Sequence, residues 1–171
     1  AGRKEGVRPP WDGGEQNPGA EGGWEAIGPT DEPYPHPDGE TSPTRAMTQA
    51  DIERVTAQFR RAAERAADIG FQIAEIHLAH GYLLHEFLSP VTNTREDEYG
   101  GSFENRVRFP LEVVEAVREV WPDEKPVFVR ISATDWLPDR PSWDIEDSAR
   151  LAPLLADAGT DLIDVSSAGI H

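Results

Sequence analysis

The sequence predicts an α/β fold built from parallel strands, and two observations support this. Three short runs of β-branched and apolar residues alternate with stretches of helical period, and no hairpin signal lies between them. Strands joined through helices in this way run parallel, with right-handed crossovers. The sequence also lacks a G-x-G-x-x-G or P-loop motif, which would indicate a doubly wound nucleotide fold. A segment of a barrel is therefore the better prediction.

The first helix is expected to begin after Thr48, which can act as N-cap with Asp51 at the third position. Gly70 lies where a left-handed C-terminal cap belongs, and the first strand, Phe71 to His77, follows at once. One apolar stripe recurs at spacings of three and four along this helix: Ile52, Val55, Phe59, Ala62, Ala66 and Ile69.

A second helix is expected from the N-cap Ser102 to about Val120, and Pro110 should kink it or restart it after a first short turn. Val127 to Ser132 (VFVRIS) then reads as a buried strand. The residues of the helix expected to face inward are Val107, Leu111, Val114 and Val117.

The third helix is predicted after the N-cap Asp144, with Asp147 three residues on, and it ends at Gly159. Asp161 to Ser166 (DLIDVS) is the last predicted strand. An aromatic loop from Asp135 to Trp143 precedes this helix.

The 171 residues are expected to form a single domain. Residues 5–46 are rich in proline and glycine and show neither helical nor strand period, so they predict a long ordered loop. Trp11 and Trp24 in this loop favour packing onto another surface.

Charge and composition exclude several classes of protein. The net charge of −16 argues against nucleic-acid or anionic-membrane partners. No apolar run approaches the length of a membrane span, and the first residues do not form a secretory signal, so a cytoplasmic protein is expected. Without cysteine there is no disulfide and no thiolate metal site in this sequence. Lys4 and Lys125 are the only lysines, and acidic excess with scarce lysine is typical of halophilic proteins.

The candidate chemistry lies where the first strand ends. His77, His80 and Tyr82 occur within six positions, and the carboxyl ends of parallel strands carry the functional loops of such folds. Two imidazoles and a phenol could bind an oxygen atom and transfer a proton. The residues alone leave two other interpretations open: a structural role, or a metal site completed by His85 or Glu86.

A longer motif surrounds these residues. Glu75 to Pro90 (EIHLAHGYLLHEFLSP), followed by Thr94 to Phe109 (TREDEYGGSFENRVRF), resembles the central motif of the Old Yellow Enzyme family of FMN-dependent NAD(P)H oxidoreductases, in its His-x-x-His branch. The resemblance runs from Ala1–Lys4 (AGRK) to Asp164–Ser167 (DVSS), with a looser match over residues 5–46.

The resemblance implies roles for the site. His77 and His80 would donate hydrogen bonds to the carbonyl oxygen of an enone, which stabilises the enolate that forms on hydride transfer. Tyr82 would give its proton to the α-carbon. Arg130 would lie against the N1 and O2 edge of the flavin. The cofactors implied are FMN and NAD(P)H, and the substrate is a small-molecule enone.

Other residues receive weaker interpretations. The motif Tyr99 to Arg106 is expected to be structural, with its arginine joining loop to helix. Glu75 is assigned no catalysis. Trp136 and Trp143, together with Trp11 and Trp24, are expected either to shape the substrate pocket or to pack at the surface.

The resemblance also implies a (β/α)8 barrel, which needs about 250 residues. The sequence would therefore be a partial TIM barrel, strands four to six with their helices and residues 5–46 over the active-site face, and inactive by itself. A homo-oligomer is one expectation for a full-length protein. Two alternatives remain: a larger relative of the dienoyl-CoA reductase or amine dehydrogenase kind with an iron–sulfur cluster, and a metal-dependent TIM-barrel hydrolase.

Overall fold

The computed structural model describes residues 2–4, 24–34 and 43–170. Its elements occur along the chain in the following order: β1 (Ala26–Gly28), β2 (Thr44–Ala46), α1 (Gln49–Asp68), β3 (Ala74–Leu78), α2 (Leu83–Leu88), α3 (Phe103–Arg118), β4 (Val127–Ser132), α4 (Ile145–Asp157) and β5 (Leu162–Ser166).

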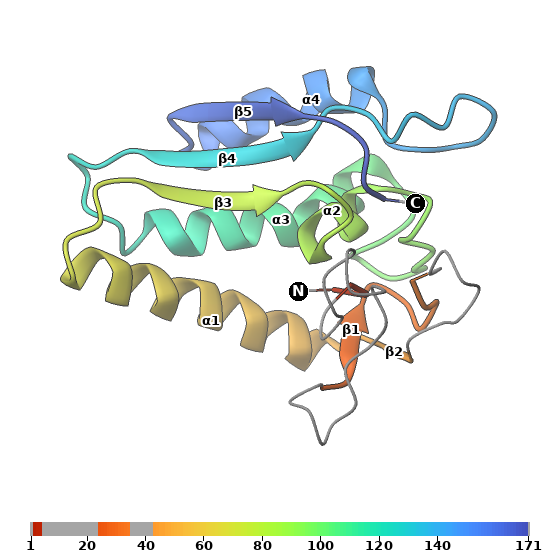
Figure 1. Ribbon diagram of the computed structural model, residues 1–171, viewed down its shortest axis with the longest axis horizontal. Helices are drawn as coiled ribbons and strands as arrows, with labels where there is room; N and C mark the ends of the chain where they lie inside the picture. Colours follow the sequence, from red (N-terminus) through yellow and green to blue (C-terminus); the bar gives the residue numbers. More distant parts are fainter. Residues whose placement is uncertain (1, 5–23, 35–42, 171) are drawn as a thin grey trace, which may run out of the picture.

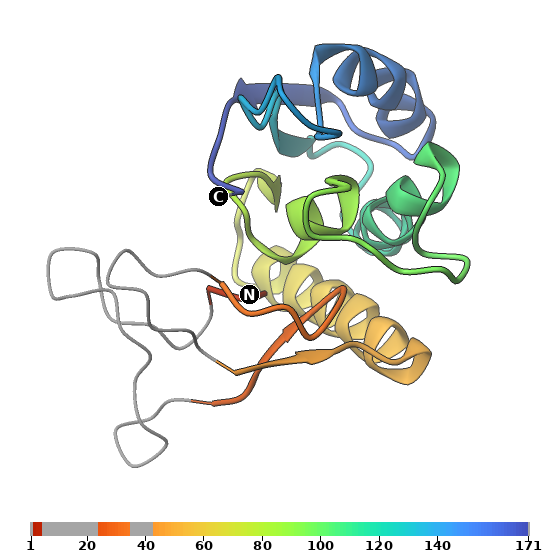
Figure 2. The ribbon, with the colours of Figure 1, turned by 90° about the vertical axis from the view of Figure 1, so that its right-hand side faces the viewer.

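The main sheet consists of β3, β4 and β5 in that order, and all of its strands are parallel. Helices α3 and α4 make the crossovers between successive strands (Figure 1). The view along the strands places α1, α3 and α4 on one side of the sheet and leaves the opposite face without helices (Figure 2). The predicted parallel α/β arrangement is therefore confirmed.

The two faces of the sheet have different chemistry, because side chains alternate along a strand. Val127, Val129 and Ile131 of β4 are buried and belong to the core shared with the helices. Arg130 lies between them in the sequence and so points to the opposite, helix-free face, as does Glu75 of β3. This second face carries the polar residues of the sheet.

The local signals for helix ends are confirmed. Thr48 and Asp51 form a complete capping box at the start of α1, and Ser102 caps α3 through Asn105. Asp144 Oδ1 accepts the amide hydrogens of both Glu146 and Asp147, each at 2.9 Å. Gly70 and Gly159 have φ values of +92° and +96°, in the left-handed region that follows these helices.

The prediction for the first strand is wrong at its start. β3 begins at Ala74, and Phe71 and Ile73 are exposed to 58% and 49%. The ladder can begin only where β4 offers a partner, and Ala74 pairs with Val127. Lys125 Nζ instead holds the carbonyl of Phe71 at 2.9 Å. The apolar stripe of α1 also ends early, since Ile69 is the C-cap and is exposed.

Three further elements differ from the prediction. β1 and β2 form a short parallel pair inside the region expected to lack strands; strands of three residues are too short to show a period. Residues 5–23 and 35–42 of that region, including Trp11, lie outside the described residues. Helix α2 was not expected at all, because every one of its six residues is buried and no amphipathic pattern marks it.

The predicted restart at Pro110 and the tryptophan predictions also need correction. α3 continues through Pro110 as one helix, without a restart. Trp143 lines no substrate pocket and does not pack at the surface. It is fully buried, stacks on Phe103 with ring centroids 6.0 Å apart, and donates from Nε1 to Ser148 Oγ. Trp136, in contrast, is 67% exposed. Among the described residues, no helix is long and apolar enough to cross a membrane.

Candidate active site

A row of three polar residues crosses the helix-free face of the sheet. His77 of β3 pairs with Arg130 of β4, and Arg130 pairs with Asp164 of β5. Arg130 Nε lies 3.2 Å from Asp164 Oδ2. The cation within an apolar strand thus has the structural ion pair that its position requires.

His77, His80 and Tyr82 gather at the carboxyl end of β3. The ring centroids of His77 and His80 are 5.1 Å apart, and those of His77 and Tyr82 are 5.5 Å apart. Tyr82 is 40% exposed, so part of this residue is accessible to a ligand. His77 and Tyr82 also line a cavity of about 280 Å³ together with Phe59, Leu83 and Leu84. The structure therefore brings the predicted residues together.

His80 is held in a strained turn. Its φ is +59°, a left-handed value that is uncommon for residues other than glycine and that concentrates at functional sites. Ser132 Oγ accepts the His80 amide hydrogen at 3.0 Å, and Ser166 Oγ lies 2.7 Å from His80 Nε2. Lys4 Nζ donates to the carbonyl oxygens of His80, at 2.8 Å, and of Gly169.

The surroundings of both imidazoles favour the neutral form over the charged form. Burial lowers the pKa of His77 below its usual value of 6.5, and the neighbouring His80 and Arg130 lower it further. Burial and the Arg130 cation also lower the pKa of His80. Each ring therefore carries one N–H for hydrogen bonding, and its second nitrogen is an acceptor.

The metal-site interpretation is wrong in its choice of third ligand. His85 Nδ1 accepts the Gly81 amide hydrogen at 2.9 Å, and His85 Nε2 lies 3.0 Å from Asp135 Oδ1. Glu86 Oε1 accepts the Arg3 amide hydrogen at 2.8 Å. Within residues 2–4, 24–34 and 43–170, no three His, Asp or Glu side chains are grouped to hold a metal ion.

A family model described as "NADH:flavin oxidoreductase / NADH oxidase family" matches residues 11–171. The chain belongs to this family. An NADPH dehydrogenase of Geobacillus thermodenitrificans is 48% identical over 147 residues, which are 85% of this chain and 41% of that enzyme. The chain thus spans less than half the length of the curated relative.

Solved structures of the flavin oxidoreductase family have the same fold. Morphinone reductase in complex with tetrahydroNAD matches with a TM-score of 0.69 and 34% identity over 84% of this chain and 43% of its own. Histamine dehydrogenase from Rhizobium sp. 4-9 matches with a TM-score of 0.76 and 31% identity, over 85% of this chain and 21% of its own. The neighbours are TIM-barrel enzymes of the Old Yellow Enzyme type, so β3, β4 and β5 are part of such a barrel, and the relatives are oxidoreductases.

FMN and NAD(P)H are the cofactors of the flavin oxidoreductase family. The donor set of the site fits a flavin at Arg130. Its Nε is buried and makes no well-directed hydrogen bond, despite the nearby carboxylate of Asp164. The side chain as a whole is 38% exposed on the helix-free face, where a planar guanidinium can pair with an anionic, planar partner.

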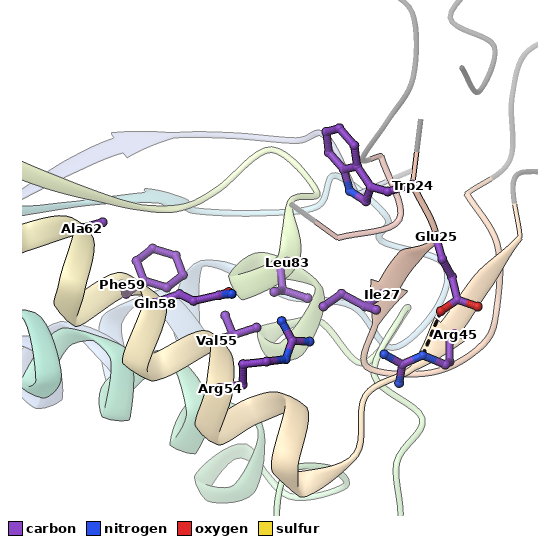
Figure 3. A pocket seen from close by; sticks show the side chains of 10 residues that line it. All are labelled: Trp24, Glu25, Ile27, Arg45, Arg54, Val55, Gln58, Phe59, Ala62 and Leu83. Atoms are coloured by element: carbon purple, nitrogen blue, oxygen red, sulfur yellow. Dashed lines mark hydrogen bonds and ion pairs between the residues drawn. The ribbon is translucent and has the colours of Figure 1, made fainter. Parts of the chain in front are cut away.

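A second cavity, of about 470 Å³, shares Phe59 and Leu83 with the cavity beside His77 and Tyr82 (Figure 3). Trp24, Val55 and Phe59 line it, and the pair Arg45–Glu25 lies at one end. None of His77, His80, Tyr82 or Arg130 contributes to its wall. Trp24 therefore lines a neighbouring cavity and is not a wall residue of the cavity beside His77 and Tyr82.

The motif Tyr99 to Arg106 is structural, as expected. Arg106 Nε donates to Leu88 O at 2.8 Å, its Nη1 donates to Gly101 O at 2.7 Å, and Nη2 lies 3.3 Å from Asp147. One arginine thus joins α2, the glycine turn and α4.

Four residues around the histidines were not predicted from the sequence: Lys4, Ser132, Asp164 and Ser166. Asp164 and Ser166 could have been found, because they alternate along β5 on the same face as Arg130. No local signal pointed to Lys4, whose contacts lie 76 and 165 residues away.

Proposed function

We propose that the protein is an FMN-dependent ene-reductase of the Old Yellow Enzyme type that reduces the activated C=C bond of enones with NAD(P)H. The observation that carries this is the grouping of two neutral imidazoles and an accessible phenol beside a fixed cation, at the carboxyl ends of β3 and β4. The pair His77 and His80 belongs to the His-x-x-His branch.

His77 and His80 bind the carbonyl oxygen of the substrate in this proposal. The negative charge that develops on that oxygen is stabilised by preorganised donors. Ser166 Oγ lies 2.7 Å from His80 Nε2. When this hydroxyl donates to Nε2, the proton of neutral His80 is on Nδ1, the nitrogen that can face a ligand.

Arg130 would hold the N1 and O2 edge of FMN, which when bound supplies a hydride for the β-carbon. Tyr82 donates its hydroxyl proton to the α-carbon, and the C=C bond becomes a C–C single bond. Because Tyr82 is 40% exposed, water can return the proton to the phenolate. One hydride and one proton are consumed, and a saturated ketone is formed.

The experiment measures binding of a para-substituted phenol, whose oxygen occupies the carbonyl position, to the FMN-loaded full-length protein. His77→Ala and His80→Ala should each raise the Kd about tenfold or more, as expected for the loss of a hydrogen bond to a charged partner, while FMN stays bound. Glu75→Gln is the matched control, because it changes an exposed residue of the same strand face. Unchanged phenol affinity in both histidine variants would refute the proposed clamp.

The second candidate is a larger relative of the histamine dehydrogenase kind. The observation that favours it is the TM-score of 0.76 with that enzyme, against 0.69 with morphinone reductase. Iron and acid-labile sulfide measured on the purified full-length protein distinguish the two: the ene-reductase has neither, and the larger relative has a cluster.

A further inference from the structure

A buried chain of polar contacts lies directly behind the turn that carries the site. The Gly81 amide hydrogen is accepted by His85 Nδ1 at 2.9 Å. His85 Nε2 lies 3.0 Å from Asp135 Oδ1, a close contact that is not aligned as a hydrogen bond, and the side chains of both residues are completely buried. This chain connects the turn after β3 with the loop after β4. Neither the clamp nor the proton donor of the proposed function uses His85.

The pattern of donors fixes the tautomer of His85. Gly81 N–H is a donor, so Nδ1 must present a lone pair, and the proton of the neutral ring is on Nε2. The Asp135 carboxylate lies 3.0 Å from Nε2, and its own orientation is set. Asp135 Oδ2 accepts from Ser89 Oγ at 2.7 Å and from the Trp143 amide at 2.9 Å.

Gly81 is the residue between His80 and Tyr82. Its φ is +71° and that of His80 is +59°, so two consecutive residues are left-handed. A Cβ at Gly81 would lie 1.9 Å from Gly169 O, which leaves no room for a side chain. The direction of the Gly81 N–H defines the plane of the peptide between His80 and Gly81, and with it the positions of the flanking side chains.

We propose that His85, held by Asp135 as the Nε2–H tautomer, is a positioning residue that orients the His80–Gly81 peptide and so places Tyr82 and His80 for the reaction. This inference rests on the proposed function. A buried pair with a merely structural role would lower stability when changed, whereas a positioning pair affects the step that uses Tyr82.

Two substitutions separate the two halves of the His85 contact. In His85→Asn, the amide oxygen occupies nearly the position of Nδ1 and can accept from Gly81, but no group reaches Asp135. In His85→Gln, the terminal amide can donate to Asp135, but no acceptor remains at the Nδ1 position. Both variants lose the ring, so their comparison controls for lost packing.

Asp135→Asn tests the tautomer independently. Ser89 and Trp143 both donate to Oδ2, so the amide oxygen takes that position and the NH₂ group faces His85 Nε2. The His85 proton must then move to Nδ1. There it points at the Gly81 N–H, so two donors face each other and no hydrogen bond forms between them. Asp135→Asn should therefore resemble His85→Gln.

The experiment uses the FMN-loaded full-length protein in anaerobic stopped-flow measurements. Reduction of the flavin by NADPH needs no proton from Tyr82, whereas its reoxidation by 2-cyclohexenone does. We expect His85→Gln and Asp135→Asn to slow reoxidation about tenfold or more and to change reduction less than about twofold, as one mispositioned general acid would. His85→Asn should restore most of the reoxidation rate.

Equal slowing of both half-reactions, or equal slowing in His85→Asn and His85→Gln, would overturn the inference. Tyr82→Phe, measured in parallel, distinguishes failure of the proposed function from failure of the His85 inference. Normal reoxidation in Tyr82→Phe refutes the proposed proton donor. Slow reoxidation in Tyr82→Phe together with a normal rate in His85→Gln refutes only the role of His85. For variants that do not fold, ¹⁵N NMR of the wild-type imidazole decides, because a proton on Nδ1 of His85 contradicts the assignment.

Discussion

At the scale of single residues, Glu86 lies in surroundings that disfavour a charge. The side chain is fully buried in α2, and Arg3 Nε lies 3.6 Å from Oε1. Oε2 makes no hydrogen bond within the described part of the chain. Burial raises the pKa of Glu86 to about 8 from 4.5, against the opposing effect of the Arg3 cation.

The raised pKa predicts a pH-dependent stability. A group with a higher pKa in the folded state stabilises the fold fully below its unfolded value of 4.5, and this contribution is lost as the pH rises through about 8. The glutamine in Glu86→Gln cannot ionise. The free energy of unfolding of this variant minus that of the wild type should therefore increase by roughly 2–5 kcal/mol between pH 5 and pH 8.5. Urea unfolding at the two pH values measures this. A constant difference between the two proteins would contradict it.

The grouping of the site could be predicted in part from the sequence. His77, His80 and Tyr82 follow one another at a strand end, so a local motif is enough to find them, and their proximity is confirmed. Their chemical roles stay predictions. Lys4 and Asp135 could not be found this way, because their contacts with His80 and His85 depend on how distant loops meet.

At the scale of elements, the ends of the helices were the most predictable features. Caps are interactions between residues two or three apart, so a short stretch of sequence contains all of the information. β1, β2 and the start of β3 depend on pairing with distant segments. α2 depends on burial from all sides, which no local pattern records.

The capping box of α1 gives the prediction at this scale. Thr48 Oγ1 accepts the Asp51 amide hydrogen at 3.2 Å, and Asp51 Oδ2 accepts the Thr48 amide hydrogen at 3.0 Å. Thr48→Ala removes the first of these bonds and should lower the free energy of unfolding by about 1 kcal/mol. Thr48→Ser keeps the hydroxyl and is the matched control. Equal stability of the alanine and serine variants in urea would refute the contribution of the cap.

At the scale of the whole molecule, charge is the dominant feature. The net charge is −16, and self-repulsion of this size destabilises a compact state in dilute buffer.

The sheet also has an unpaired edge on β3 and on β5 within the described residues, and the chain covers 41% of a curated relative. Residues 1–171 alone are therefore expected to retain FMN weakly or not at all.

We propose a halophilic adaptation as the reason for the acidic surface, and salt tests it. Molar KCl reduces the screening length to about 3 Å and should raise the thermal midpoint by roughly 5 °C or more over dilute buffer. NaCl at the same ionic strength should have the same effect, because screening does not depend on the cation. A flat or falling midpoint would rule the adaptation out.

The central claim is that Tyr82 supplies the proton for reduction of an enone held by His77 and His80. The rate of flavin reoxidation by 2-cyclohexenone in Tyr82→Phe, under anaerobic stopped-flow conditions, tests it most directly. Tyr99→Phe is the matched control, since it removes a hydroxyl that points to Glu112 instead. A general acid contributes about 10²-fold or more, so reoxidation should slow by that factor in Tyr82→Phe alone, with reduction by NADPH unchanged. Reoxidation of Tyr82→Phe at the wild-type rate would contradict the claim.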